Sequence, residues 1–217
     1  MRTFGFPEFL FILEAAKWTL ALSAIAFVGG AILGLIIALM RTSESAWARG
    51  VSTTFIQIFQ GTPLLLQLFL VFFGAPVLGL DINPWVAAGV ALVLNSAAFL
   101  GEIWRGCIQA IPRGQWEAAQ ALNLHYVARM RDVVLPQAFK IALAPTVGYL
   151  VQIIKGTSLA AIIGFVEVTR AGQIVNNATF QPLIVFSVVA AIYFVICWPL
   201  SLLAARMERK RAQALAR

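Results

Sequence analysis

The sequence predicts an all-α integral membrane protein with five transmembrane helices in a single domain, residues 1–217. Hydrophobic residues make up 61% of the chain and charged residues 12%, whereas a soluble domain is nearer about a quarter charged. Basic residues gather in alternate connections between the apolar runs, as they do in membrane proteins. The runs long enough to cross about 30 Å of hydrocarbon cover about residues 18–40, 54–73, 85–103, 138–154 and 183–204.

A short apolar stretch precedes the first span. Residues 4–13 are apolar but are interrupted or flanked by Glu8 and Glu14, so we expect an interfacial helix there. A cleaved signal peptide is the alternative for residues 18–40, because Lys17 stands before them. That run is longer than a signal-peptide core, and no clear cleavage site with a soluble domain follows it.

The second span contains three glutamines on one expected helical face, since Gln57, Gln60 and Gln67 are spaced by three and seven residues. The tripeptide at 61–63, Gly-Thr-Pro, interrupts the helix near them. For Gln57 and Gln60, hydrogen bonds to neighbouring helices and contact with a transported solute are equally good explanations. Gln67 lies deeper and is the better candidate for lining a route.

The third span places Asn95 and Ser96 near the membrane midplane. Counted from Pro84 at 1.5 Å per residue, Asn95 is roughly 16 Å into the membrane. Glu102 is then roughly 27 Å in, near the opposite face. Asn95 and Ser96 are therefore candidate solute contacts, and Glu102 either pairs with a nearby arginine, Arg105 or Arg113, or belongs to a gate.

A polar stretch at 105–136 has four arginines and cannot belong to an apolar core. Residues 115–122 favour a helix, because Gln, Glu, Ala and Leu are good helix formers, and Asn123 suits a left-handed residue at its end. A second amphipathic helix is expected at 126–135, before Pro136. Its apolar face is predicted to hold Val127, Met130, Val133 and Val134.

The segment after the fourth span, 155–181, is less hydrophobic. It begins with Lys155, which either meets an acidic group or extends to the membrane surface. Glu167 and Arg170 are three residues apart. They are expected either to form a local ion pair on an outward helix or to contact a gate or partner.

Twelve of the 16 lysines and arginines lie on one side of the five predicted spans. They fall in the first connection, around the central loop and in the tail, and this distribution predicts an external N-terminus and a cytoplasmic loop and C-terminus. The net charge of +7 is explained by this topology, so no nucleic-acid partner is expected.

Motifs for catalysis are missing from the sequence. It has no G-x-x-x-x-G-K-[ST] phosphate-binding motif, no H-E-x-x-H and no paired cysteines. Cys107 and Cys197 are far apart and are expected to be free thiols. We therefore predict a non-enzymatic chain with no metal site and no cofactor of its own.

Several of these stretches together resemble the membrane subunits of ABC importers, most closely the polar amino acid permease family. They are Glu117-Ala118-Ala119 followed by Val134-Leu135-Pro136, the run 61–67, the run 95–103, and the run 167–170. Two positions depart from the family pattern. Asn123 stands where the family has glycine, and His125 stands where a small polar residue usually opens the second helix.

The resemblance implies that the polar loop docks onto a separate ATPase. The coupling residues would be Gln115, Glu117, Ala118, Ala119, Leu122 and Asn123. The substrate path would comprise Gln67, Asn95, Ser96, Gln152, Lys155, Gly156, Thr157 and Ser158. The gate or partner contacts would be Glu102, Glu167 and Arg170. Many family members have an acidic residue at the position of Gly156, and its absence here disfavours a cationic amino acid.

The expected assembly is an amino acid importer in the bacterial inner membrane. It has two permease copies, identical or homologous, and two ATPase subunits that bind ATP and Mg. A periplasmic or lipid-anchored binding protein supplies the amino acid, and lipid surrounds the spans. The alternatives are a gradient-driven secondary transporter or channel for a small polar solute, and an integral membrane enzyme.

Overall fold

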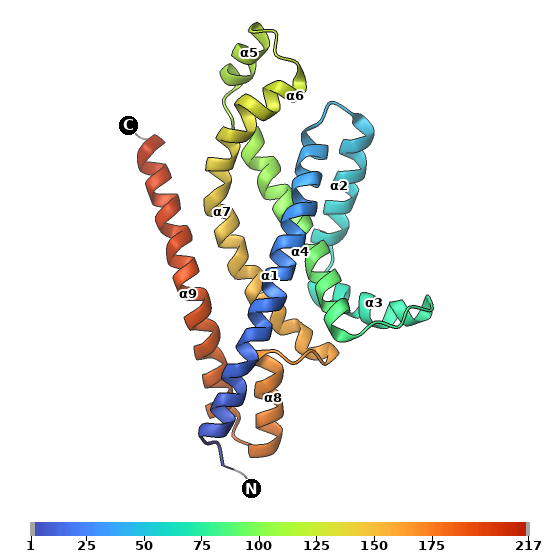
Figure 1. Ribbon diagram of the computed structural model, residues 1–217, viewed down its shortest axis with the longest axis vertical. Coiled ribbons are helices and arrows are strands. Elements are labelled where there is room, and N and C mark those ends of the chain that lie inside the picture. The colour runs from blue at the N-terminus through green and yellow to red at the C-terminus, as the bar shows by residue number, and fades with distance from the viewer. Residues whose placement is uncertain (1–2, 216–217) are drawn as a thin grey trace.

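The computed structural model describes residues 3–215, and all regular elements in that range are helices (Figure 1). Within these residues, four helices are long and apolar enough to cross a membrane, and the bent pair α2–α3 gives a fifth span if it is counted as one. The elements are α1 (Phe6–Thr42), α2 (Ala46–Gly61), α3 (Leu64–Val77), α4 (Pro84–Gln109), α5 (Arg113–Ala121), α6 (Tyr126–Ala128), the π-helix η1 (Arg129–Val134), α7 (Leu135–Gly156), the 3₁₀-helix η2 (Thr157–Ile163), α8 (Val168–Thr179) and α9 (Pro182–Leu215).

Helix α1 is one unbroken helix of 37 residues, so the prediction of a separate interfacial helix at 4–13 is wrong. Glu8 does not interrupt the helix, because its carboxylate accepts a hydrogen bond from the Gly5 N–H at 3.1 Å and caps the first turn. Glu14 is exposed on the helix surface and disturbs nothing.

Helices α1 and α4 pack closely through small residues. A Cβ atom added to Gly30 would lie 2.5 Å from Ser96 Cβ, and one added to Gly34 would lie 3.1 Å from the Gly101 backbone nitrogen. Small residues allow two membrane helices to approach this closely, and their backbones then gain van der Waals contact. This contact makes α1 and α4 the central pair of the bundle.

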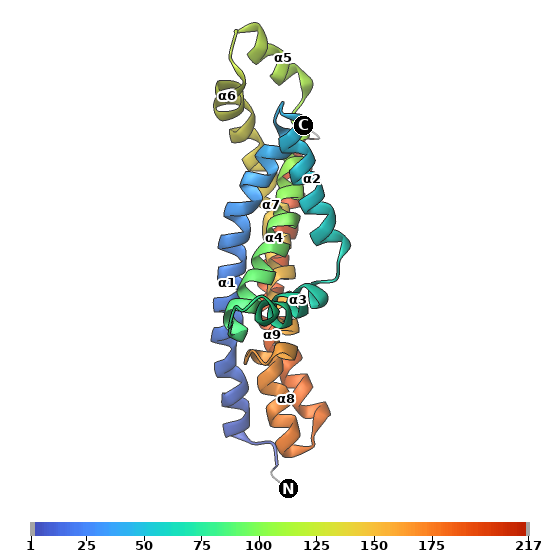
Figure 2. The ribbon, with the colours of Figure 1, turned by 90° about the vertical axis from the view of Figure 1, so that its right-hand side faces the viewer.

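The second span, expected at 54–73 with an interruption at 61–63, is broken there, because the chain bends by 101° between α2 and α3. Thr62 and Pro63 adopt extended backbone angles, and proline provides no N–H to continue the helix. Figures 1 and 2 show α3 lying across the long axis of the bundle. Gln67 therefore does not share a helical face with Gln57 and Gln60.

The polar loop forms the expected helix, turn and helix, but its second helix continues into the bundle. Asn123 has φ +58°, which confirms the left-handed turn predicted for it. Pro136 does not end the second helix, since the backbone widens into η1 just before it. A π-turn relieves the clash between a proline ring and the carbonyl four residues earlier. The widening also changes the buried face. Met130 and Val134 are buried as predicted, but Val127 is 63% exposed.

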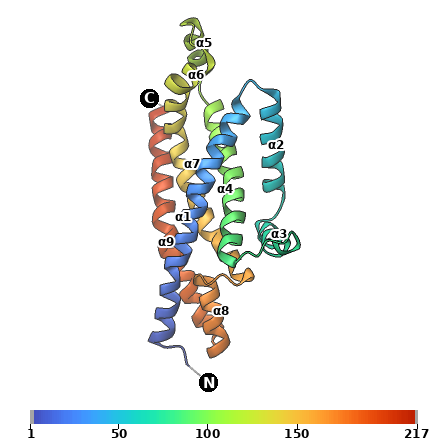
Figure 3. The ribbon, with the colours of Figure 1, turned by 45° about the vertical axis from the view of Figure 1, so that its right-hand side comes forward.

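The basic segments gather at one end of the molecule. Figures 1 and 3 show α5, α6, the α1–α2 connection and the C-terminal end of α9 at that end. The N-terminus and α8 lie at the other end. Helix α9 extends beyond the predicted span to Leu215, so most of the basic tail is helical. Arg2 and Arg217, which enter the charge count, lie outside the described residues.

Candidate functional site

The surface of α5 exposes most of the residues predicted to couple to an ATPase. Gln115, Glu117 and Ala118 are exposed, as are Leu122 and Asn123 just after the helix. Ala119 is only 2% exposed and faces the protein. Leu122 is 75% exposed, a high value for a large apolar side chain. The helix therefore presents a mixed polar and apolar face that a partner could cover.

Three helices hold this loop in place. Trp116 packs on a buried cluster that includes Ala38 of α1, Ile111 after α4, and Met130 and Val134 of η1.

Two hydrogen-bonding side chains add to this packing. The Tyr126 hydroxyl donates to the Thr42 carbonyl at 3.0 Å. The Gln137 amide donates to Gln115 Oε1 at 3.2 Å and to the Val133 carbonyl at 2.8 Å. The Gln137 side chain thus connects α5 to the start of α7.

A buried pair of amides lies where α2, α3 and α4 meet. The Asn95 amide donates to Gln67 Oε1 at 3.1 Å. The Gln67 amide nitrogen lies 2.8 Å from the Phe59 carbonyl, 3.0 Å from the Thr62 carbonyl and 2.9 Å from the Thr62 hydroxyl. Gln67 thereby supplies donors to two backbone carbonyls that the break at 61–63 leaves without a helical N–H partner. The Tyr149 hydroxyl of α7 lies 3.5 Å from Asn95 Oδ1.

The other polar residues of the second and third spans are separate from this pair. Ser96 is 1% exposed and packs against Gly30 of α1. The Gln60 amide donates to the Ala98 carbonyl at 3.3 Å, as the helix-packing interpretation predicts. Gln57 is exposed.

The stretch 152–158 has two environments. Gln152 and Lys155 are exposed, whereas Thr157 is fully buried. The hydroxyls of Thr157 and Ser158 donate to the Ile154 and Lys155 carbonyls at 2.7 and 2.6 Å. Since a hydroxyl has a single proton, neither offers a donor to a carboxylate in this conformation.

Gly156 connects that stretch to the buried amide pair. A Cβ atom placed on Gly156 would lie 3.2 Å from Leu64 Cδ2 of α3 and 3.7 Å from Leu92 Cδ2 of α4. Gly156 therefore lies beside the helices that carry Gln67 and Asn95, although these residues are far apart in the sequence.

Glu102 forms the local ion pair that the sequence suggests. The Arg105 Nε–H donates to Glu102 Oε2 at 2.8 Å, and Arg41 Nη2 lies 3.9 Å from the same oxygen. Arg105 lies three residues after Glu102 on the same helix, α4, so the ion pair is local to that helix.

Glu167 and Arg170 do not form the ion pair predicted for an outward helix. Glu167 is 0% exposed, and its Oε1 accepts the backbone N–H of Arg170 at 2.9 Å. The Arg170 guanidinium donates instead to Gln173 Oε1 at 3.1 Å. The prediction failed because Glu167 is the N-cap of α8, and its side chain turns inward. Its further partners, Thr19 and Tyr193, were not identified from the sequence.

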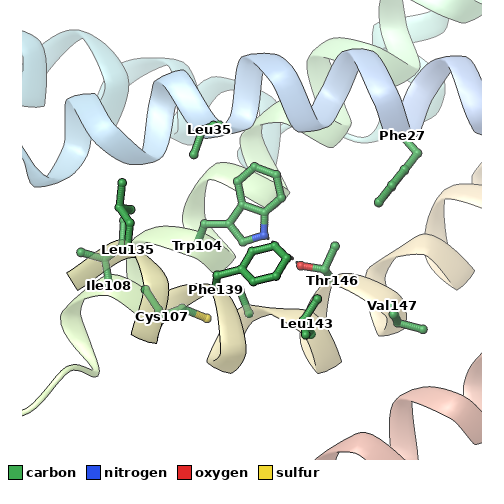
Figure 4. Close-up of a pocket in the computed structure, with 12 residues that line it drawn as sticks. Phe27, Leu35, Trp104, Cys107, Ile108, Leu135, Phe139, Leu143, Thr146 and Val147 are labelled. Atoms are coloured by element: carbon green, nitrogen blue, oxygen red, sulfur yellow. Dashed lines mark hydrogen bonds between the residues drawn. The ribbon is translucent and has the colours of Figure 1, made fainter. Parts of the chain in front are cut away.

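An apolar cavity of about 490 Å³ lies between α1, α4 and α7 (Figure 4). Its lining includes Leu35, Trp104, Phe139 and Leu143, and its hydroxyl group is that of Thr146. The Trp104 indole N–H donates to that hydroxyl at 2.8 Å. The cavity contains none of the predicted path residues, and its chemistry suits hydrocarbon better than an amino acid.

Comparisons with known proteins agree with this architecture. Residues 30–213 match the family described as "Binding-protein-dependent transport system inner membrane component". The glutamine transport system permease protein GlnP of Escherichia coli K12 is 36% identical over 206 residues, which cover 94% of each chain. The arginine transport system permease protein ArtQ of Bacillus subtilis 168 is 38% identical over 205 residues, again 94% of each chain.

A solved structure gives the same result. The crystal structure of an amino acid ABC transporter with histidines has a chain that matches with a TM-score of 0.88 and 33% identity. The match covers 96% of this chain and all of the other. The chain belongs to the binding-protein-dependent transport system inner membrane component family, as a multi-pass inner membrane permease subunit of an ABC importer of the polar amino acid type.

Proposed function

We propose that α5 is the element through which this permease subunit couples amino acid import to ATP hydrolysis. The carrying observation is the exposed face of α5, where Glu117, Ala118 and Leu122 lack cover although Ala119 and Trp116 anchor the helix. An ATPase groove that covers this face would bury Leu122 and pair with Glu117. Two permease copies with two ATPase subunits and a binding protein form the proposed assembly.

The proposed orientation places α5 and the C-terminus in the cytoplasm. The basic connections lie at that end of the molecule, which supports the assignment from charge distribution. The N-terminus and α8 then lie at the periplasmic end, where a binding protein would deliver the solute.

The proposed route passes the buried amides of α3 and α4. Gln67 and Asn95 are hydrogen-bonded to each other, and Gly156 lies against the same two helices. Separation of α3 from α4 would free amide donors and acceptors for the ammonium and carboxylate groups of an amino acid. The remaining path residues, Ser96, Gln152, Lys155, Thr157 and Ser158, would contribute as the helices rearrange.

The proposed substrate is a neutral or acidic amino acid. Gly156 provides no carboxylate beside Leu64 and Leu92, so a cationic side chain would lack a counter-charge there. The two amides are uncharged, and each offers both an N–H donor for the carboxylate and a carbonyl acceptor for the ammonium group of an amino acid.

Substrate-stimulated ATP hydrolysis tests this proposal. The chain is co-expressed with its ATPase and binding protein, the complex is placed in liposomes, and each amino acid is offered in turn. We expect one neutral or acidic amino acid to stimulate hydrolysis. Stimulation by arginine, lysine or histidine would contradict the proposed substrate class, and a chain that never copurifies with an ATPase would contradict the coupling role.

A further inference from the structure

We infer that Glu167 is a positioning residue for transport, because its buried carboxylate holds the start of α8 onto both α1 and α9. This inference rests on the proposed function. Among the side chains that the structure describes, Glu167 is the one acidic or basic group that is fully buried. No lysine or arginine between residues 3 and 210 forms an ion pair with it.

Hydrogen bonds from three elements satisfy the carboxylate. The Arg170 N–H in the first turn of α8 donates to Oε1 at 2.9 Å. The Thr19 hydroxyl of α1 lies 3.4 Å from Oε2, and the Tyr193 hydroxyl of α9 donates to the same oxygen. An ionised carboxylate is an acceptor only, and all three partners are able to donate.

The surrounding groups extend this arrangement into a network. Thr19 Oγ1 accepts the Val168 N–H at 3.3 Å, so α1 contacts both the cap and the first residue of α8. The Thr169 hydroxyl lies 3.3 Å from the Tyr193 oxygen. Because the single proton of Tyr193 goes to Glu167, the Thr169 hydroxyl is the donor in that pair.

Apolar packing already joins these helices without Glu167. A buried cluster connects Ile12 of α1, Val175 of α8 and Val189 of α9. Such packing is non-directional, and a buried carboxylate is costly unless it is fully hydrogen-bonded. The contribution of Glu167 is therefore directional, since it fixes the position and rotation of the first turn of α8.

The fixed turn lies next to the proposed route. Residues 164–167 alone separate α8 from η2, and η2 begins with Thr157 and Ser158. Gly164 has φ +87°, and Phe165 is buried against the α3–α4 core, so this connection is short and held at both ends. Glu167 thus determines where the outer end of the route segment 156–163 lies. Without the carboxylate, binding of the substrate-loaded binding protein at α8 should no longer change the position of the route segment or of α5.

The test compares basal ATP hydrolysis with hydrolysis stimulated by the substrate-loaded binding protein, in the complete complex in liposomes. For Glu167→Gln, we expect unchanged basal hydrolysis and about a tenfold loss of the stimulated component, the effect of losing a hydrogen-bonded charge. Glu167→Asp should recover part of the stimulated hydrolysis, because it restores a carboxylate. The recovery should be incomplete, because the shorter side chain reaches fewer donors. Tyr193→Phe removes one donor without changing the cap, and should reduce stimulation less.

Thr179→Val is the matched control, because Thr179 is buried in the same helix but its hydroxyl donates only to the Val175 carbonyl within α8. We expect it to keep full stimulation. Full stimulation in Glu167→Gln would overturn the inference, as would an equal proportional loss of basal and stimulated hydrolysis. If Glu167→Gln fails to assemble, full stimulation in Tyr193→Phe overturns it instead. Failure of the wild-type complex to respond to the binding protein would contradict the proposed function, which separates the two claims.

Discussion

The α5 loop and the α2–α3 break both place polar side chains near α4, but the polar side chains at the break are buried and those on α5 are exposed. At the break, Gln67 and Asn95 are buried and hydrogen-bonded within the chain. On α5, Gln115 and Glu117 are exposed on a helix that is nevertheless firmly anchored. A polar residue in this molecule therefore supports the fold where it is buried, and is available to a partner where a rigid helix exposes it.

The largest expected effect is the loss of transport in Glu117→Arg. Reversing the charge on the exposed face of α5 should abolish ATP-driven uptake, because the ATPase groove would then meet an unpaired cation. The chain should still fold and insert normally, since Glu117 is exposed and is not part of the core. Uptake in liposomes and heat stability in detergent measure the two effects.

Glu208→Arg is the control for this charge reversal. Glu208 is exposed near the C-terminal end of α9, and that end of the helix lies at the same end of the molecule as α5 (Figure 1). We expect it to leave uptake intact. Normal uptake in Glu117→Arg, or equal losses in both variants, would remove the distinction between α5 and the rest of that end.

The next effect is on stability and comes from Gln67→Leu. This change removes the Gln67 side-chain partner of the Phe59 and Thr62 carbonyls and of the Asn95 amide, which keeps only a 3.5 Å contact to the Phe59 carbonyl. We expect the free energy of unfolding to fall by about 2–4 kcal/mol, because buried polar groups that lose their partners keep their desolvation cost. The midpoint of heat denaturation in detergent measures the change.

Gln57→Leu sharpens the same comparison. Gln57 is exposed on α2, so its replacement should alter stability by less than about 0.5 kcal/mol. Similar losses in the two leucine variants would mean that the buried amide pair does not stabilise the break.

The smallest effect is expected at the turn after α5. Asn123 has φ +58°, where a β-branched residue is strained and glycine is not. Asn123→Val should lower stability by about 1–2 kcal/mol and reduce uptake in parallel. Asn123→Gly should preserve both. Equal behaviour of the two variants in heat denaturation and uptake would show that the loop does not require this conformation.

Much of the fold could be predicted from the sequence, because hydropathy and charge act over long segments. The apolar runs, the helical loop and the turn at Asn123 follow from local composition. Local signals also misled in places. Glu8 suggests a boundary in α1, but it caps the first turn, and Pro136 suggests an end to a helix that continues through a π-turn.

The tertiary partners of polar residues could not be predicted, since they depend on which helices meet. Glu167 and Arg170 have the spacing of an ion pair, but packing against α1 and α9 turns the carboxylate inward. Thr19 was visible as a polar residue in an apolar helix, and Gly30 and Gly34 as a small-residue pattern. Both patterns indicate a close contact with another helix, but neither identifies which helix makes the contact.

Site-specific cross-linking tests the role of α5 most directly. Ala118 and Ala119 are neighbours, but Ala118 is exposed and Ala119 faces the protein. Both native cysteines, Cys107 and Cys197, are buried, so an introduced cysteine on the surface would react first. In membranes that contain the complete importer, we expect Ala118→Cys to cross-link to the ATPase subunit and Ala119→Cys not to do so. Absence of any cross-link from Ala118→Cys to the ATPase, in a complex that still hydrolyses ATP in response to substrate, would contradict the assignment of α5 as the coupling element.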